Sequence, residues 1–140
     1  MKVNTMGKLK GPPLYGGQKL EYWNGQWESL DGGFGIQHKK VHGRFGLYRA
    51  VLAKKVVFIG CSIDLNARLQ QLRSGKELST NNYHSARKIR EHVGELELEV
   101  LLPERRLRAR LNITTLKWAM VRQSRPVWNY SLPFRRENRK

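Results

Sequence analysis

Gly46–Arg68 reads GLYRAVLAKKVVFIGCSIDLNAR, and this stretch decides the fold. Two runs rich in β-branched and aromatic residues, Leu47–Leu52 and Val56–Ile59, lie on either side of a short break, which predicts an antiparallel β-hairpin. Asp64 is then typical of a residue that caps the start of a helix. Leucines at positions 65, 69 and 72 follow with the spacing of one helix face. The stretch therefore predicts two paired strands followed directly by a helix.

The rest of the chain extends this unit into a small α+β domain. A second helix is predicted from about Asn82 to Val93, and a third strand over Glu95–Val100, where acidic and apolar residues alternate. A last helical region is predicted from Pro103 to Gln123, with a break near Asn112. The order β-β-α-α-β-α predicts a three-stranded antiparallel sheet flanked by helices.

The first 42 residues are predicted to form an arm and a β-hairpin that pack on the same domain. Residues 1–18 are rich in Gly, Pro and Lys, which favours an extended arm. Lys19–Leu30 carries aromatic residues around Asn24-Gly25, a pair that supplies the positive φ angles of a tight hairpin turn. The core is then predicted over residues 43–134, and residues 135–140 form a basic tail.

Length and composition are typical of one folded domain in a reducing compartment. The chain has 140 residues, of which 39% are hydrophobic, so it is long enough to bury a core. No apolar run approaches the roughly 18 residues of a membrane span, and the N-terminus has no apolar signal core. A single cysteine, Cys61, excludes an internal disulfide framework and the usual cysteine zinc sites. We therefore expect a cytoplasmic protein; the sequence leaves its oligomeric state open.

The charge is large and uneven. The formal net charge is +16, and the segment from Glu104 to Lys140 holds eleven Lys and Arg residues against two acids. This segment therefore carries +9, and the first 103 residues carry the remaining +7. Such a basic segment indicates a polyanionic partner, most often nucleic acid, although a solubilising surface is the alternative.

Four motifs, in this order, resemble the GIY-YIG nuclease family. Gly46-Leu47-Tyr48 corresponds to the family's Gly-Ile-Tyr, and Phe58-Ile59-Gly60 to its Tyr-Ile-Gly. Arg68 falls where the family has an arginine on its first helix, and Pro126–Asn129 resembles its closing Pro-x-x-Asn segment. The resemblance spans about 84 residues and implies the family's α+β fold.

The resemblance implies an endonuclease that hydrolyses DNA phosphodiesters with Mg²⁺. Tyr48 would orient or deprotonate the attacking water, and a phenol, whose ordinary pKa is about 10, needs a cation nearby to act as a base. Arg68 would clamp the scissile phosphate, because a guanidinium matches phosphate in a bidentate fork. A glutamate on the last helix would hold Mg²⁺, and Asn129 would support the site. Phe58 lacks the hydroxyl of the family's second tyrosine.

The metal-binding glutamate is where the chain departs from the family. Counting back by the family's usual spacing of about twelve residues from Asn129 reaches Lys117. An ammonium there repels Mg²⁺, which is enough to impair hydrolysis, so we expect no intact metal site in this chain. Three explanations compete: an acquired or engineered inactivating change in a nuclease, a natural pseudo-nuclease that retains DNA binding, or an ammonium that replaces the metal as a phosphate electrophile.

Two basic clusters are candidates for DNA contact. On the predicted second helix, His84, Arg87 and Lys88 share one side, although a solvated face is the alternative. The densest cluster comprises Arg105, Arg106, Arg108 and Arg110, which we expect to contact the DNA backbone without reading sequence. Double-stranded DNA is therefore the predicted partner.

The leading hypothesis is a DNA-binding, Mg²⁺-dependent endonuclease of the GIY-YIG type that Lys117 inactivates or impairs. The second is a natural, catalytically silent DNA-binding module that acts as a repressor or competitor. The third is a protein-interaction role in which the nuclease fold supplies only a surface. The sequence indicates neither a target site nor a preferred DNA structure.

Overall fold

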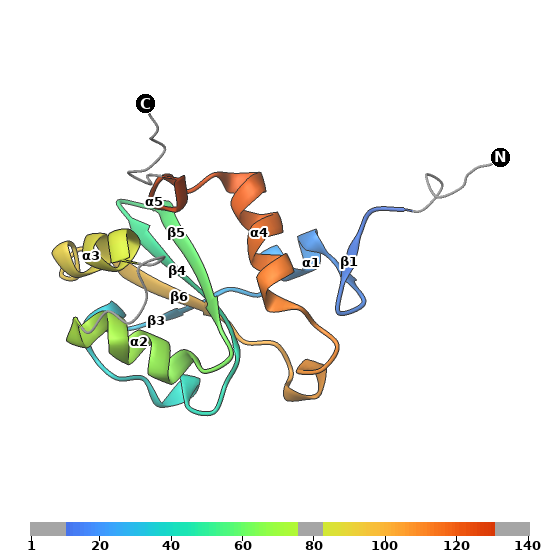
Figure 1. Cartoon of the computed structure of the whole chain (residues 1–140), viewed down its shortest axis with the longest axis horizontal. Coiled ribbons are helices and arrows are strands. Elements are labelled where there is room, and N and C mark those ends of the chain that lie inside the picture. Colours follow the sequence, from blue (N-terminus) through green and yellow to red (C-terminus); the bar gives the residue numbers. More distant parts are fainter. Residues whose placement is uncertain (1–10, 76–82, 131–140) are drawn as a thin grey trace.

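The computed structural model describes residues 11–75 and 83–130, which form an α+β fold (Figure 1). The α+β prediction is confirmed. No helix in this part of the chain is long and apolar enough to cross a membrane. In chain order, the strands and helices are β1 Leu14–Tyr15, β2 Gln18–Lys19, α1 Leu20–Asn24, β3 Glu28–Leu30, β4 Gly46–Leu52, β5 Lys55–Ser62, α2 Leu65–Ser74, α3 Tyr83–Glu91, β6 Glu97–Leu101, α4 Ile113–Ser124 and α5 Val127–Tyr130, with 3-10 turns η2 Gly33–Gly35, η3 Lys39–Val41 and η5 Arg105–Leu107.

The main sheet is antiparallel and has the strand order β3-β6-β4-β5. The predicted hairpin is β4–β5, and its turn contains two non-glycine residues with positive φ, Ala53 and Lys54. The predicted third strand is β6, which pairs with β4. The expectation of three strands is wrong, because β3 adds a fourth: Glu28 lies opposite Val100, and Leu30 opposite Leu98.

The N-terminal hairpin lies earlier in the chain than predicted. Lys19–Leu30 forms the short helix α1 and the strand β3, because Gly25 has a φ of −91° and does not make a tight turn. The turn is made by Gly16 and Gly17, both with positive φ, between β1 and β2. Trp23 then packs into the core, and its indole N–H donates to the Tyr15 carbonyl at 2.8 Å.

The last helix starts later than predicted. The region from Pro103 begins with the 3-10 turn η5, and the α-helix α4 begins only at Ile113. Asn112 caps this helix, since its side-chain oxygen accepts a hydrogen bond from the Thr115 N–H at 3.0 Å. The cluster Arg105–Arg110 therefore lies on a turn and a loop.

Helices cover both faces of the sheet. Figure 1 shows α2 and α3 on one side of the sheet, and α4 with α1 on the other. Tyr48, Ala50 and Val100 belong to the core beneath α2 and α3, whereas Leu47 and Ile59 belong to the core beneath α4. This alternation follows from the pleat of a strand, in which successive side chains point to opposite faces.

The residues before β4 complete both cores. Phe34 and Val41 are buried with Tyr48, and Trp23 is buried beneath α4. On the α4 face, the Arg49 guanidinium lies 4.3 Å from the centre of the Trp27 ring and pairs with the Glu99 carboxylate.

Asn129 covers the free edge of β5. Its amide oxygen accepts from the Ile59 N–H at 2.9 Å, and its amide N–H donates to the Ile59 carbonyl at 3.0 Å. The side chain therefore pairs with the edge strand as a further strand would, and it fixes α5 on β5.

We expect Asn129→Ala to lower the free energy of unfolding by about 1–3 kcal/mol, because both Ile59 backbone groups lose a partner. Urea denaturation monitored by circular dichroism measures the loss. Asn24→Ala is the matched control: it removes an exposed amide that bonds to the Gln123 side chain, and it should cost under about 0.5 kcal/mol. Equal losses in the two variants would show that the edge contact does not stabilise the fold.

Candidate functional site

The candidate site is built around Tyr48, in the middle of β4. Tyr48 lies directly opposite Gly60 on β5, and its side chain is 1% exposed. A Cβ atom at position 60 would overlap the Tyr48 ring. Glycine at the end of the Phe58-Ile59-Gly60 motif therefore has a structural reason, since any larger residue would displace the phenol.

Arg68 of α2 meets the Tyr48 hydroxyl. Its Nε–H donates to the Tyr48 oxygen at 3.2 Å, and its Nη1 donates to Gln71 Oε1 at 3.1 Å. The helix is held in place at its start, because the Leu65 N–H donates to the Arg44 carbonyl just before β4. The structure therefore brings together two of the residues that the motifs predicted.

Burial raises the pKa of the Tyr48 phenol above its ordinary value, and the charge and hydrogen bond of Arg68 only partly oppose this effect. The phenol therefore stays protonated at neutral pH. The side chain is also shielded from solvent, and its hydroxyl accepts the hydrogen bond from Arg68 Nε–H. The expectation that Tyr48 orients or deprotonates an attacking water stays a prediction.

Aromatic rings enclose Tyr48 on two sides. Phe58 is buried, and its ring centre lies 6.0 Å from that of Tyr48. The Phe34 ring packs edge-on against Tyr48 at 6.4 Å. Phe58 thus has an apolar packing role in this structure. Sequence reasoning missed Phe34, for which no local signal exists, and Gln71, which lies three residues after Arg68 and so on the same helix face.

Asn129 and Lys117 flank β5 from other elements. Asn129 bonds to the β5 backbone at Ile59, so its role in this structure is to support the strand. Lys117 is half-buried on α4, and its Nζ lies 4.2 Å from the centre of the Trp118 ring. One turn earlier, the Thr114 hydroxyl lies 3.9 Å from Cys61 Sγ on β5. Lys117 therefore belongs to the helix on the sheet face opposite Tyr48, and on the flank that runs along β5.

The residues present do not fit the Mg²⁺ ion that the family resemblance implies. Position 117 offers an ammonium, whereas Mg²⁺ needs oxygen ligands. The Asp64 carboxylate caps α2 by accepting from the Ala67 N–H at 3.1 Å, and Glu104 pairs with Arg106 at 2.6 Å. Within residues 11–75 and 83–130, no group of three or more His, Cys, Asp or Glu side chains could hold a metal ion.

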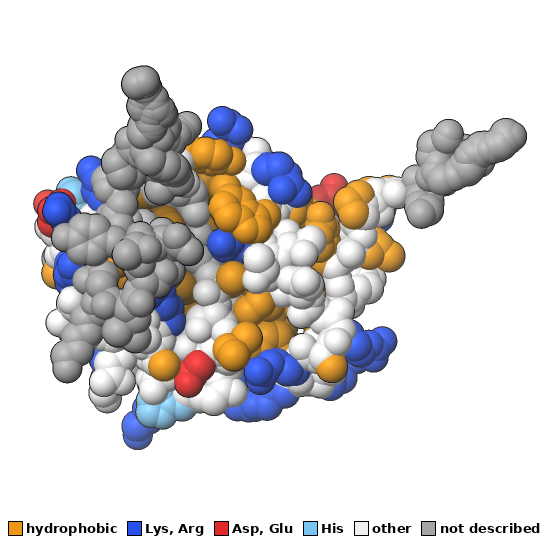
Figure 2. Space-filling model, in the orientation of Figure 1, with side chains coloured by type: hydrophobic (Ala, Val, Ile, Leu, Met, Phe, Trp, Pro, Cys, Tyr) orange, Lys and Arg blue, Asp and Glu red, His pale blue; other side chains and the backbone are white. Residues whose placement is uncertain are grey.

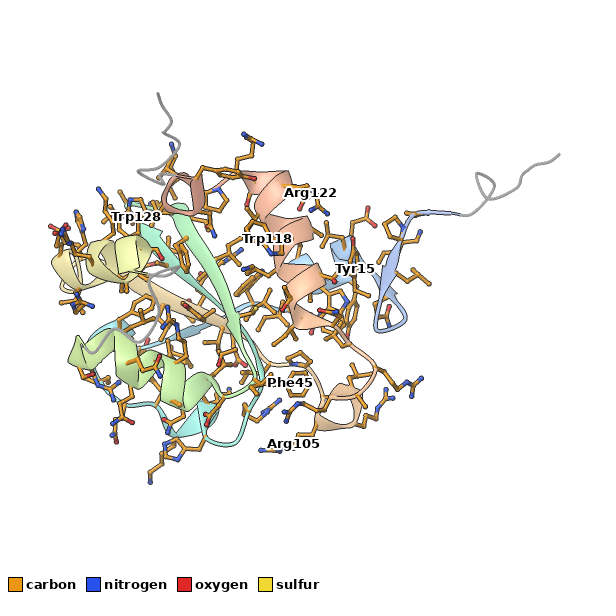
Figure 3. The ribbon with its side chains drawn as sticks, viewed as in Figure 1. Tyr15, Phe45, Arg105, Trp118, Arg122 and Trp128 are labelled. Atoms are coloured by element: carbon orange, nitrogen blue, oxygen red, sulfur yellow. The ribbon has the colours of Figure 1, made fainter. Side chains whose placement is uncertain are left out.

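The predicted arginine cluster is exposed and lies at the end of the sheet where β4 begins. Arg108 lies 5.7 Å from the Phe45 ring centre, and Arg44 donates to the Pro103 carbonyl at 2.9 Å. Figure 3 labels Arg105 and Phe45 in this part of the molecule, and Figure 2 shows Lys and Arg side chains along this edge. The four side chains of this cluster are all exposed: Arg105, Arg106, Arg108 and Arg110.

The α3 cluster lies elsewhere. Arg87 is exposed and Lys88 half-buried, and the side chain of His84 lies outside the described residues. Figure 1 shows α3 and the 105–110 segment on different sides of the molecule. The two predicted DNA-contact clusters therefore do not form one continuous surface across the described residues.

Comparisons of the chain with protein-family models, with curated proteins and with solved structures found no match. The resemblance to the GIY-YIG family therefore stays a prediction from four sequence motifs. Two structural contacts bear on the motif residues: Arg68 bonds to Tyr48, and Asn129 bonds to the strand that ends in Gly60.

The raised pKa of Tyr48 predicts a stability loss in alkali. An unfolded tyrosine ionises near pH 10, whereas Tyr48 in the folded chain holds its proton to higher pH, so the free energy of unfolding should fall above about pH 10. The decrease of the free energy of unfolding with pH should be smaller in Tyr48→Phe, by up to about 1.4 kcal/mol per pH unit. Urea unfolding at several pH values between about 8 and 11 measures this decrease.

The exposed ring of Tyr22 provides the control for this experiment, because Tyr22→Phe removes a hydroxyl without changing a buried residue. If the free energy of unfolding falls equally with pH in the wild type and in Tyr48→Phe throughout alkaline pH, the assignment of a buried, protonated phenol is contradicted.

Proposed function

We propose that this chain is a DNA-binding protein of the GIY-YIG type, in which Arg68 contacts a phosphate, Tyr48 positions Arg68, and Lys117 impairs Mg²⁺-dependent hydrolysis. The observation that carries the proposal is the hydrogen bond from Arg68 Nε to the Tyr48 oxygen, between two motif residues twenty positions apart. Such pairing within four ordered motifs supports a built site over two unrelated surface residues.

The geometry of Arg68 suits a phosphate. A guanidinium has five N–H donors, and those of Nε and one of Nη1 are used by Tyr48 and Gln71. Nη2 makes no hydrogen bond to any described residue, so it retains donors for a phosphate oxygen. Because Tyr48 is buried and Arg68 is half-buried, an approaching phosphate meets the guanidinium first.

Position 117 decides the chemistry in this proposal. The family resemblance implies a metal-binding carboxylate at this position, whereas Lys117 offers an ammonium on the flank of α4 along β5, which attracts phosphate and supplies no oxygen ligand to Mg²⁺. Hydrolysis is then impaired, while binding of a polyanion is favoured.

We expect Lys117→Glu to gain Mg²⁺-dependent DNA cleavage of at least about tenfold over the wild-type chain, because a barrier lowered by about 1.4 kcal/mol already has that effect. Nicking and linearisation of a supercoiled plasmid measure the activity, with and without a chelator. Lys117→Gln removes the charge without supplying a carboxylate, and Lys117→Glu combined with Arg68→Ala removes the phosphate clamp; both should stay inactive.

A second candidate function is a catalytically silent DNA-binding module, and the buried, protonated state of Tyr48 favours it. Tight DNA binding by Lys117→Glu without cleavage would select this alternative and reject the impaired nuclease. In either case the partner is duplex DNA, and the third candidate, a protein-interaction role, requires that DNA is not bound.

Binding through the exposed arginine cluster should depend steeply on salt. A protein that neutralises several phosphates loses about 10³-fold or more in affinity between 50 and 200 mM salt. Replacing Arg105, Arg106, Arg108 and Arg110 by Gln should weaken duplex binding and reduce the slope of log affinity against log salt by up to about 3–4. Fluorescence anisotropy with a labelled duplex measures both.

Lys54→Gln with Lys55→Gln is the matched control, since these exposed lysines lie at the β4–β5 turn, at the opposite end of the hairpin from Arg44 and Phe45. It should change the salt slope less than the arginine variant does. No affinity for any duplex at low salt would reject DNA binding and favour the protein-interaction role.

A further inference from the structure

Trp118 is an exposed indole on α4 that the proposed site does not use. Its side chain is 42% exposed, whereas Trp23 and Trp128 are buried and Trp27 is half-buried. Of the four tryptophans, Trp118 therefore has the ring surface that is most available to a ligand.

A cation lies against this indole, and another lies against the ring of Tyr130 on α5. Lys117 Nζ lies 4.2 Å from the Trp118 ring centre, and Arg122 follows one helical turn after Trp118. Beyond the helix end, the Arg125 guanidinium lies 4.6 Å from the centre of the Tyr130 ring. Figure 2 shows hydrophobic side chains gathered over α4 with Lys and Arg side chains beside them, and Figure 3 shows Trp118 and Arg122 on the same helix.

The charge of this region is of one sign. From Arg105 to Tyr130 the sequence contains seven Lys and Arg residues and no Asp or Glu. A surface that combines an exposed indole and a half-buried tyrosine ring with cations matches a ligand that carries flat rings and negative charges. Unpaired nucleic acid is that ligand, because its bases stack on aromatic side chains while its phosphates are neutralised. A plain duplex does not fit as well, since its base faces are covered by stacking within the helix.

We propose that Lys117, Trp118, Arg122, Arg125 and Tyr130 form an aromatic–basic strip that binds an unpaired strand of DNA. The inference rests on the proposed function, because it assumes that the chain binds DNA, and it deepens that function by naming the substrate class. The arginine cluster at residues 105–110 contacts duplex, and the aromatic–basic strip holds a single-stranded segment. DNA that joins a duplex to an unpaired arm is then the preferred ligand.

The strip lies on a helix that packs against the strand of the candidate site. α4 packs on β5, the strand whose Gly60 lies under the Tyr48 ring. Lys117 begins the strip on the flank of α4 that runs along β5. An unpaired arm on the strip therefore lies beside the strand that carries the candidate site.

Tryptophan fluorescence tests the stacking contact. A single-stranded oligothymidylate of about 12 nucleotides, added at low salt, should quench the emission of the wild-type chain, because the exposed indole stacks on a base. Trp118→Phe should lose most of the quenching and bind within a few-fold of wild type by anisotropy, and Trp118→Ala should bind about tenfold more weakly. Unchanged quenching in Trp118→Phe would overturn the assignment of the strip.

A comparison of forked and blunt DNA with the same duplex separates this inference from the proposed function. Wild type should prefer the fork by about fivefold or more; Trp118→Ala should lose the preference and keep its affinity for the blunt duplex. Replacing Arg105, Arg106, Arg108 and Arg110 by Gln should weaken both ligands.

The possible results distinguish the aromatic–basic strip from the proposed function. Binding to the blunt duplex with no effect of Trp118→Ala on the fork overturns the strip and leaves the proposed function intact. Binding of single strands through Trp118 with no affinity for any duplex supports the strip and rejects duplex binding as the function. Absence of binding to all three DNA forms rejects both.

Discussion

The hydrogen bond between Arg68 and Tyr48 depends on the absence of a side chain at position 60. Because β4 and β5 are antiparallel and Tyr48 lies opposite Gly60, the ring occupies the space that a Cβ atom would fill. The phenol is thereby buried among apolar residues, which raises its pKa, and the guanidinium that reaches it from α2 gains a fixed orientation. The protonation state of the phenol and the direction of the guanidinium both depend on this packing contact.

Two positively charged regions lie on the surface, away from the buried phenol of Tyr48. The arginine cluster at residues 105–110 is exposed at one end of the sheet, whereas the aromatic–basic strip lies on α4 and α5. Neither region contains an acid that would hold a cation, and Lys117 adds a further positive charge beside β5. In our proposal, one fold therefore offers phosphate a positioned guanidinium and two basic surfaces, and it has lost the oxygen ligand that would turn binding into hydrolysis.

The segment before β4 belongs to the fold as much as the motif-bearing hairpin does. β3 extends the sheet through β6, Phe34 closes one side of the Tyr48 ring, and Trp23 fills the core beneath α4. Sequence reasoning misplaced this segment because two candidate turns compete within a few residues. Gly16-Gly17 makes the turn with positive φ angles, and Asn24-Gly25 ends a helix instead, since burial of Trp23 favours the helical turn.

By itself, the sequence determined the strand–turn–strand–helix unit and its cap at Asp64, because these depend on local periodicity. The motifs also named Tyr48 and Arg68 as site residues, and the structure then showed the hydrogen bond between them. It also determined the charge and its concentration after Glu104. Only the tertiary structure decided that a fourth strand joins the sheet, that Tyr48 is buried, and that Asn129 pairs with the backbone of Ile59. These features depend on contacts between segments far apart in the chain, and such contacts leave no periodic pattern in the sequence.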